Sequence, residues 1–352
     1  MCLTIFRLSR DSAYVLTFGL FFLRIIFHMS DKTAVILMNT GSPAAPTEAA
    51  LRTYLKEFLS DPRIIELPSW IWQPILRGII LRTRPAKSAQ RYRKIWMPDG
   101  SPLIVYTQKI VEALNDRLPD DIVVVMAMKV GSPSVEQTVA RLKKDGINHF
   151  IFFPMFAQYA TQTTESALDG VRELKGELKD IHWDWIRPFY NRADFIEALA
   201  AKIQSNRTPG AHLVMSFHGI PVKSIQKGSP YEKQCRETAQ SIAAKLQLKD
   251  GDYSIAYQSR FGNDHWLQPY LTGHVESLVH QGVRSIDVVC LSFSVDCLET
   301  LEEIGIELKN HFISLGGEHF NLLPCLNDDA NALDCYEKLI LESISTLKSK
   351  KR

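Results

Sequence analysis

The amino-acid sequence predicts an α/β fold in which repeated βα units build parallel sheets. From Thr33 onward, short β-rich apolar runs alternate with longer stretches of helical periodicity. The chain of 352 residues is long enough for two domains with sizeable cores, and no low-complexity linker divides it. Eight βα units closed into a barrel and two smaller doubly wound sheets both satisfy this pattern.

The apolar runs predict strands at residues 33–39, 121–128, 149–156, 184–190, 212–218, 252–259, 285–294 and 319–327. Helical periodicity predicts helices at residues 48–59, 108–118, 136–144, 165–178, 231–246, 298–312 and 330–347. A helical and Pro-rich insertion at 51–102 interrupts the rhythm after the first strand. In either architecture, ligands are expected at the carboxyl ends of the strands.

The composition excludes several classes of protein. Lys and Arg number 41 and Asp and Glu 39, so a net charge of +2 gives no electrostatic reason to expect nucleic acid as a partner. Apolar residues make up 45% and charged residues 23%, as in a globular body. The six cysteines are widely spread without a CxxC pair, which predicts reduced, mostly structural thiols. Residues 39–43 lack the spacing of a phosphate loop.

The first 30 residues differ from the rest of the chain. An apolar run at 13–23 is flanked by Arg residues but has no small-residue cleavage site after it. The run is also shorter than the roughly 20 residues that span a bilayer. Because Met29 precedes a polar segment and then a strand, we interpret residues 1–30 as a leader outside the translated or folded protein. A membrane anchor is the alternative.

His218 is the first candidate for chemistry. It ends the predicted strand 212–218, and Gly219 and Pro221 turn the chain after it, so its imidazole is expected at the carboxyl end of a strand. Imidazole titrates near neutral pH and serves as a base or a metal ligand. A loop histidine whose ring is satisfied by backbone groups is the alternative.

A second candidate is an acidic stripe after the predicted strand 285–294. Four carboxylates are spaced by three, four and four residues, which places them on one helical face: Asp296, Glu299, Glu303 and Glu307. Like charges one turn apart destabilise a helix, so the stripe indicates a divalent cation or a proton-exchanging substrate. The alternatives are a helix cap for the first pair and a solvated face for the second.

A third candidate is the apolar segment 67–81, which contains two Trp residues and several Ile and Leu residues. Three basic residues follow it: Arg82, Arg84 and Lys87. This combination suits an apolar ligand with acidic groups or the surface of an anionic membrane. An ordinary core helix is the alternative, although Pro68 and Pro74 disfavour a long uninterrupted helix.

Eight segments, taken in order, resemble those of ferrochelatases, most closely the bacterial protoporphyrin type. The similarity extends from about Thr33 to Leu347. Its most specific motifs are SFHGIP around His218 and FSVDCLETLEEI from Phe293 onward. The supporting motifs are LMNTGSP, SDPRIIELP, WQPILR, DGSPL, TTES and YQSRFG.

The resemblance implies two similar Rossmann-like, doubly wound domains with parallel sheets, of the class II chelatase type, and a porphyrin cleft between them. The first domain is expected at residues 31–148 and 321–352, with the final helix returning to it, and the second at 149–320. Residues 67–81 are expected to form the lip through which porphyrin enters from the membrane.

The resemblance also implies the site residues. The catalytic histidine falls on His218 and the catalytic glutamate on Glu299, and metal contacts are expected from these two and from Asp296 and Glu303. Porphyrin contacts are expected from Phe293, Thr40, Lys129, Trp72, Ile75 and Leu76. The segments 156–159 and 129–130 depart from the family pattern, so their detailed contacts are expected to differ.

The implied activity is the last step of haem biosynthesis, in which Fe²⁺ enters protoporphyrin IX and two protons are released. Removing the pyrrole protons requires a base near the ring, which suits His218, while Glu299 relays a proton or holds the ring. A pocket that bends the macrocycle would expose its nitrogens. Because iron must be passed on to the ring, the acidic stripe is expected to hold it weakly.

Fe²⁺ is expected as a substrate, with no permanent cofactor. Some relatives carry an iron–sulfur cluster near the C-terminus, but Cys335 is the only cysteine in the last 25 residues, which predicts no cluster. The expected protein is cytoplasmic, contacts the inner membrane peripherally, and is a monomer or weak dimer. The alternatives are a non-enzymatic tetrapyrrole or metal carrier and a cobalt or nickel chelatase for a related macrocycle.

Overall fold

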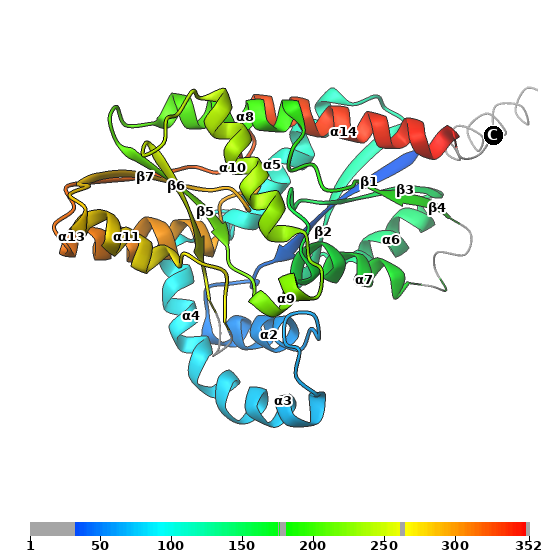
Figure 1. The fold of residues 1–352 in the computed structure, drawn as a ribbon. Coiled ribbons are helices and arrows are strands. Elements are labelled where there is room, and N and C mark those ends of the chain that lie inside the picture. Colours follow the sequence, from blue (N-terminus) through cyan, green and yellow to red (C-terminus); the bar gives the residue numbers. More distant parts are fainter. Residues whose placement is uncertain (1–31, 175, 177–180, 261–264, 350–352) are drawn as a thin grey trace, which may run out of the picture.

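The computed structural model describes residues 32–174, 176, 181–260 and 265–349. The expected leader at 1–30, with its apolar run and Met29, lies outside the described residues. Within the described part, none of the helices combines the length and the apolar character that crossing a membrane requires. The chain forms two sheets, each covered by helices on both faces (Figure 1).

The first sheet has four parallel strands in the order β2-β1-β3-β4. They are β1 (Thr33–Gly41), β2 (Ile122–Val130), β3 (His149–Pro154) and β4 (His182–Trp185). One face is covered by α5 (Pro102–Arg117) and α14 (Ala330–Ser349), the other by α6 (Val135–Lys144) and α7 (Ser166–Arg172). In β1, Val35 belongs to the core with α5, and Ile36 to the core with α6. Because both faces are buried, the strand is apolar along most of its length.

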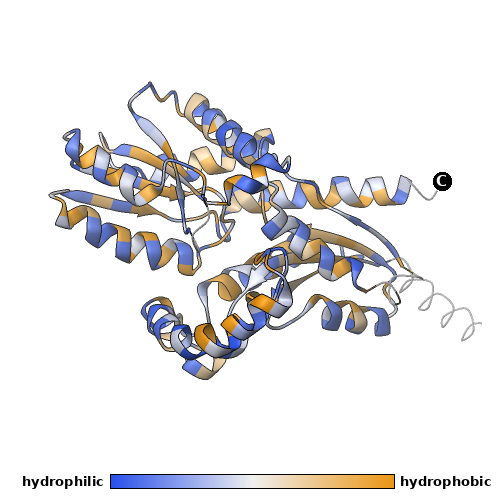
Figure 2. Ribbon diagram, turned by 60° about the horizontal axis from the view of Figure 1, so that its bottom comes forward, coloured by the Kyte–Doolittle hydropathy of each residue, from blue (hydrophilic) through white to orange (hydrophobic). Residues whose placement is uncertain are grey.

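The second sheet repeats this arrangement in the order β6-β5-β7-β8, again with parallel strands. They are β5 (His212–His218), β6 (Tyr253–Gln258), β7 (Ser285–Cys290) and β8 (His319–Leu323). One face is covered by α8 (Ala193–Asn206) and α10 (Tyr231–Lys245), the other by α11 (Leu271–His280) and α13 (Lys309–Ser314). In Figure 2 the covering helices carry both orange and blue residues, as amphipathic helices do.

The two sheets divide the chain at a different place from the one expected. The expected first domain ended at residue 148, but β3 and β4 pair within the first sheet, so the chain passes to the second sheet between residues 186 and 211. At the other end, β8 pairs with β7, so residues 321–323 belong to the second sheet. The expected boundaries are wrong because pairing between strands distant in sequence leaves no local pattern.

The final helix α14 returns to the first sheet, as expected. It packs against α5, β3, β4 and α8. The ring of Tyr336 on α14 lies 5.6 Å from that of Phe153 on β3, measured between centroids. Figure 1 shows α14 beside α8 along one side of the molecule. This helix therefore contacts both halves of the chain.

A helical insertion follows β1 and projects from the two sheets (Figure 1). It contains α2 (Glu48–Phe58), α3 (Ser69–Ile75), the π-helix η1 (Leu76–Ile80) and α4 (Leu81–Ile95). Against expectation, one helical path continues past Pro74, with Pro68 at its N-cap and a π-helical turn after Pro74. Trp72 anchors this path, because its indole N–H donates to the carbonyl of Leu59 at 2.6 Å.

Candidate active site

A cavity of about 740 Å³ lies at the carboxyl ends of the strands of both sheets, within the size range of small-molecule sites. Its walls include Thr40 at the end of β1, Met155 after β3, His218 at the end of β5 and Phe293 after β7. The insertion forms a further wall through α2 and α4. This is the place at which parallel α/β sheets bind ligands.

His218 is held in the cavity wall by its backbone. Its N–H donates to Ser292 Oγ at 2.8 Å, and the hydroxyl of Tyr231 donates to its carbonyl at 2.9 Å. The next residue must be glycine, because a Cβ at Gly219 would lie 2.9 Å from the carbonyl oxygen of Gln258. Without a side chain there, the Gly219 N–H donates to that same carbonyl at 2.7 Å. The turn that the sequence indicated therefore places the imidazole at the strand end.

The imidazole of His218 presents its Nε2 atom for chemistry. Its Nδ1 atom lies 2.7 Å from the carbonyl oxygen of Gly219. A carbonyl oxygen can only accept a hydrogen bond, so in the neutral ring Nδ1 carries the proton and Nε2 keeps its lone pair. No described residue hydrogen-bonds to Nε2. Burial lowers the pKa of His218, against the nearby charge of Glu299 and the Gly219 contact, which raise it.

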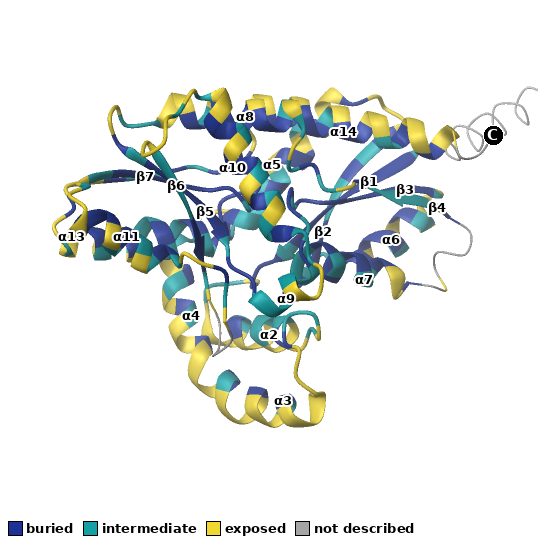
Figure 3. Cartoon of the chain, viewed as in Figure 1, coloured by how far each residue is buried: buried dark blue, intermediate teal, exposed yellow. Residues whose placement is uncertain are grey.

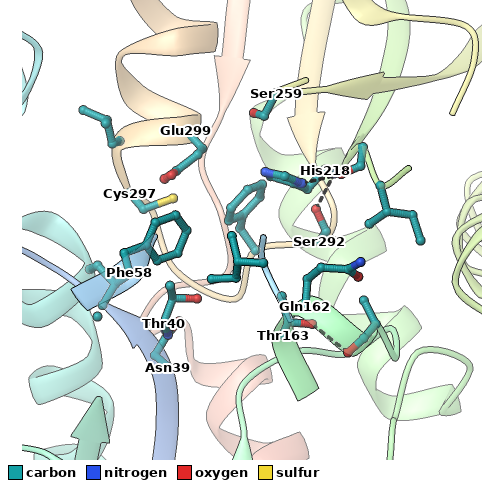
Figure 4. Close-up of a pocket in the computed structure, with 18 of the residues that line it drawn as sticks. Asn39, Thr40, Phe58, Gln162, Thr163, His218, Ser259, Ser292, Cys297 and Glu299 are labelled. Carbon is teal, nitrogen blue, oxygen red and sulfur yellow. Dashed lines mark hydrogen bonds between the residues drawn. The ribbon is translucent and has the colours of Figure 1, made fainter. Parts of the chain in front are cut away.

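Glu299 lies on the cavity wall opposite His218. It follows the start of α12 (Leu298–Leu301), the short helix that β7 leads into. Gln258 ties this helix to β6, because its Nε2 donates to the Glu299 carbonyl at 2.9 Å while its own carbonyl receives the Gly219 N–H. Figure 4 shows His218 and Glu299 on opposite sides of the pocket. The imidazole and the carboxylate therefore converge on one hollow.

Glu303 also lines the cavity, from the first residue of the π-helix η3 (Glu303–Leu308). The hydroxyl of Ser259 donates to its Oε2 at 2.6 Å. Burial, reinforced by the charge of Glu299, raises the pKa of Glu303 to about 7. Its carboxyl group therefore changes protonation state near neutral pH.

The expected acidic stripe is wrong at both ends. Asp296 precedes the helix and is buried away from the cavity, where its carboxylate accepts from Thr300 Oγ1 at 2.8 Å and Asn327 Nδ2 at 2.7 Å. Glu307 is exposed and pairs with Arg91. The pattern assumed 3.6 residues per turn throughout, but η3 widens the helix directly after α12. Only Glu299 and Glu303 of the stripe reach the cavity.

The expected metal set is correspondingly smaller. Among the described residues, no group of three or more His, Cys, Asp or Glu side chains is arranged to hold a metal ion. Asp296 is therefore removed from the expected metal contacts, because its two carboxylate oxygens are already hydrogen-bonded to Thr300 and Asn327. What remains is His218 on one wall and Glu299 and Glu303 on the other. This geometry suits weak and transient contact with a cation.

Three of the six expected porphyrin contacts line the cavity: Thr40, Trp72 and Phe293. The Phe293 ring meets that of His218 edge to face, with centroids 6.1 Å apart. The other three do not line the cavity. Leu76 is buried in the core of the insertion, and Ile75 faces outward. The ammonium nitrogen of Lys129 lies 3.9 Å from a carboxylate oxygen of Asp61. The expected contacts of these three residues with a porphyrin therefore stay predictions.

Other lining residues were not predicted as site residues. They include aromatic and basic side chains from the insertion and the thiol beside Glu299: Tyr54, Tyr92, Arg84, Arg91 and Cys297. Arg84 belongs to the basic cluster that follows the apolar segment, so the sequence carried a signal for it. The two tyrosines carried none, because they fit an ordinary helix core.

Comparison with known proteins gives a consistent result. The family model described as Ferrochelatase matches residues 32–344. Ferrochelatase 1 of Shewanella oneidensis is 41% identical over 316 residues, covering 88% of this chain and 95% of that protein. The ferrochelatase of Neisseria gonorrhoeae is 40% identical over 322 residues, covering 90% of this chain and 96% of that protein.

Among solved structures, SirB from Bacillus subtilis with Fe³⁺ has a TM-score of 0.52 at 12% identity, covering 89% of this chain and 95% of that chain. SirB from Bacillus subtilis subspecies spizizenii, described as a sirohydrochlorin chelatase in complex with cobalt, has a TM-score of 0.50 at 11% identity. At such identity the likeness concerns the fold alone. It confirms the predicted class of two parallel α/β sheets.

Proposed function

The chain belongs to the ferrochelatase family, and on that premise we propose how its cavity inserts Fe²⁺ into protoporphyrin IX to form protohaem. The reaction makes four nitrogen–iron bonds and releases the two pyrrole protons. The protein is accordingly a lyase of the metal chelatase type. Its substrates, a flat apolar ring and a divalent cation, correspond to the apolar cavity and to the carboxylates of Glu299 and Glu303 on its wall.

The observation that carries the proposal is the unprotonated Nε2 of His218, which has no described partner, in the wall of the cavity. A porphyrin seated there would offer its pyrrole N–H groups to this atom. Lowering of the His218 pKa by burial keeps the ring neutral and ready to accept a proton at neutral pH. Edge-to-face contact with Phe293 orients the imidazole.

Glu299 and Glu303 would act on the other side of the same cavity. Carboxylate oxygens are suitable contacts for Fe²⁺, and two of them without further ligands would release the ion readily to the ring nitrogens. Because the pKa of Glu303 is about 7, this group can also exchange a proton near neutral pH. Cavity walls that bend the macrocycle would use binding energy to turn its nitrogen lone pairs outward.

The direct test is metallation by the purified protein. The full chain is incubated with Fe²⁺ and protoporphyrin IX without oxygen, and the change in porphyrin absorbance is followed. A chelatase converts the free-base spectrum to that of protohaem with many turnovers. Stoichiometric binding without turnover would indicate a carrier, and a preference for Co²⁺ or Ni²⁺ in competition would indicate a different metal chelatase.

We further propose that the insertion contacts the surface of the inner membrane from the cytoplasm. Several large apolar side chains of the insertion face outward: Leu67, Trp70, Ile71, Ile75 and Ile79. Trp70 is 79% exposed, and α3 is mostly exposed in Figure 3. Basic residues lie close by, which favours anionic lipid. The lip formed by residues 67–81 adjoins the cavity, so an apolar porphyrin could pass between the membrane and the site.

Vesicle sedimentation tests this contact. The parent protein should pellet with vesicles that contain anionic lipid, and replacing both Trp70 and Ile79 by Ser should leave it in the supernatant. Replacing Leu341 by Ser provides the matched control, because Leu341 is an exposed apolar residue of α14, outside the lip, and this variant should still pellet. Equal sedimentation of the parent and the lip variant would contradict the proposal.

We also propose that the reaction needs no permanent cofactor and that the protein is a monomer or weak dimer. The sequence supports the first statement, because Cys335 is the only cysteine in the last 25 residues, near which some relatives carry an iron–sulfur cluster. Metal and sulfide analysis of the purified protein tests the first statement, and analytical ultracentrifugation the second.

A further inference from the structure

A buried ion-pair cluster joins the insertion to the helix that carries Glu299. The carboxylate of Glu302 lies in the cavity lining but has no exposed surface, and each oxygen is close to a cation of α4. Lys94 donates a hydrogen bond to Oε1, whereas among the described residues Oε2 has only the ion-pair contact with Arg91. Arg91 Nε lies 2.7 Å from Oε2, and Lys94 Nζ lies 2.8 Å from Oε1. The two partners are separated from Glu302 by more than 200 residues in sequence. We call these three side chains the α4 clasp.

The clasp is buried on one side only. The side chains of Arg91 and Lys94 remain 39% and 47% exposed, whereas Glu302 is wholly enclosed. Arg91 also pairs with the exposed Glu307. Either cation can therefore turn toward water if the cluster is broken, whereas the enclosed carboxylate of Glu302 must move from its position to reach water. A buried carboxylate without a partner is strongly unfavourable.

Glu302 stands at the point where the helix widens. Its carbonyl accepts from the N–H of Ile306 at 3.2 Å and from that of Glu307 at 2.9 Å, so the α-helical and the π-helical hydrogen bonds share one acceptor. The residue after it is Glu303, and Glu299 lies one turn before it. Displacing the side chain of Glu302 would therefore displace the carboxylates of Glu299 and Glu303.

We propose that Glu302 is a positioning residue, and that the α4 clasp holds the start of η3 against α4 so that Glu299 and Glu303 face His218 across the cavity. The inference rests on the proposed metallation activity. The clasp acts by holding two parts of the chain together. Helix α4 belongs to the insertion after β1, and η3 lies between β7 and β8 of the second sheet, so the clasp fixes one cavity wall relative to the other. In this proposal the charge of Glu302 acts by meeting the two cations, although the residue also lies in the cavity lining.

This mechanism makes an asymmetric prediction for variants. In R91Q/K94Q, Glu302 keeps its charge without partners and must move, so kcat should fall by at least about tenfold. In E302Q, the neutral amide can stay in place while the cations turn to water, so kcat should fall less, by about threefold. The triple variant R91Q/K94Q/E302Q removes every charge of the clasp. Its kcat should recover to the level of E302Q alone.

Lys94 gives the cleanest single test, because it lies outside the cavity lining. K94M should lower kcat with little change in the KM for porphyrin, and adding E302Q should remove the extra loss. E342Q is the matched control, because Glu342 pairs with Arg192 at 2.8 Å on the surface far from the cavity, and its kcat should equal that of the parent. Thermal melts establish that each variant is folded before kinetics are compared.

The measurements are kcat and KM for protoporphyrin IX, with porphyrin affinity from fluorescence quenching. Recovery in the triple variant supports the inference. Parental kcat in both K94M and R91Q/K94Q would overturn it, and so would a raised KM in R91Q/K94Q that E302Q does not relieve, since Arg91 would then bind substrate directly. If the parent itself forms no metalloporphyrin, the proposed function fails instead.

Discussion

The Nδ1 atom of His218 lies 2.7 Å from the carbonyl oxygen of Gly219, and this one contact determines which ring nitrogen faces the cavity. The carbonyl oxygen can only accept a hydrogen bond, so Nδ1 carries the proton and donates, and Nε2 is left as the base. The contact is made within the turn after β5, and Gly219 is required there by the closeness of β6. A backbone arrangement thus sets the chemistry of a side chain.

Replacing His218 by Gln should abolish most metallation while sparing porphyrin binding. A glutamine amide keeps much of the side-chain size but cannot accept a pyrrole proton as a base, so kcat should fall by at least about 100-fold. Porphyrin affinity should change little, because the apolar cavity walls remain. Stopped-flow absorbance gives the rate and fluorescence quenching the affinity. Metallation at the parental rate would rule out His218 as the base.

The pH dependence of metallation should reflect the lowered pKa of His218. The base must be neutral to accept a proton, and burial lowers its pKa from the ordinary value of 6.5. Activity should therefore persist as the pH falls through 6.5 and decline only below it. The measurement is kcat/KM for porphyrin against pH in the E303Q variant, at saturating Fe²⁺ and without oxygen, because the carboxyl group of Glu303 itself titrates near pH 7. A decline that is already half complete above pH 6.5 would contradict the burial of this ring.

Replacing Glu303 by Gln should stabilise the protein at alkaline pH. Folding raises the pKa of this carboxyl from 4.5 to about 7, so the folded state binds the proton more tightly than the unfolded state. The parent therefore loses stability as the pH rises from 4.5 to about 7, by up to about 3 kcal/mol. The advantage of E303Q should be full at pH 8 and should fade toward pH 4.5. Urea unfolding at both values measures it, and a pH-independent difference would argue against the raised pKa.

The same variant should raise the iron concentration that the enzyme needs. The glutamine amide of E303Q would keep a hydrogen-bond acceptor for Ser259 but lose the negative charge that attracts a cation into the cavity. The apparent KM for Fe²⁺ should increase while the KM for porphyrin stays near that of the parent. An unchanged iron requirement would show that Glu303 plays no part in handling the metal.

Replacing Asp296 by Ala should affect stability and not iron use. Its carboxylate accepts from Thr300 and Asn327 in the protein interior, and loss of these charge-assisted bonds should lower the free energy of unfolding by about 3 kcal/mol. The apparent KM for Fe²⁺ should match that of the parent in folded protein. Denaturant unfolding and iron titration measure the two effects, and a raised KM without loss of stability would restore Asp296 to the metal site.

The sequence predicted features that depend on local order. The apolar runs identified all eight strands of the two sheets, although β4 begins and ends earlier than the expected 184–190. His218 and Glu299 were both placed at strand ends, because a Gly-Ile-Pro turn follows one strand and a helix follows the other. Parallel sheets gather such ends at one edge, so their convergence follows from the fold class.

Features that depend on long-range pairing or on irregular helix geometry could not be predicted from the sequence. The π-helical turn at η3 moved Glu307 away from the expected stripe, since periodicity analysis assumes a constant 3.6 residues per turn. The partners of Glu302 lie on α4 more than 200 residues away, and nothing in either segment marks the pairing. The membership of β3 and β4 in the first sheet was hidden for the same reason.

Helix α14 has a consequence for how the protein is made. It is the last helix of the described chain, yet it completes the cover over β3 and β4, where Tyr336 meets Phe153. During translation, the first sheet emerges from the ribosome long before the helix that shields it. A nascent chain therefore leaves part of an apolar sheet face uncovered until α14 has been synthesised, and such exposed apolar surface favours aggregation.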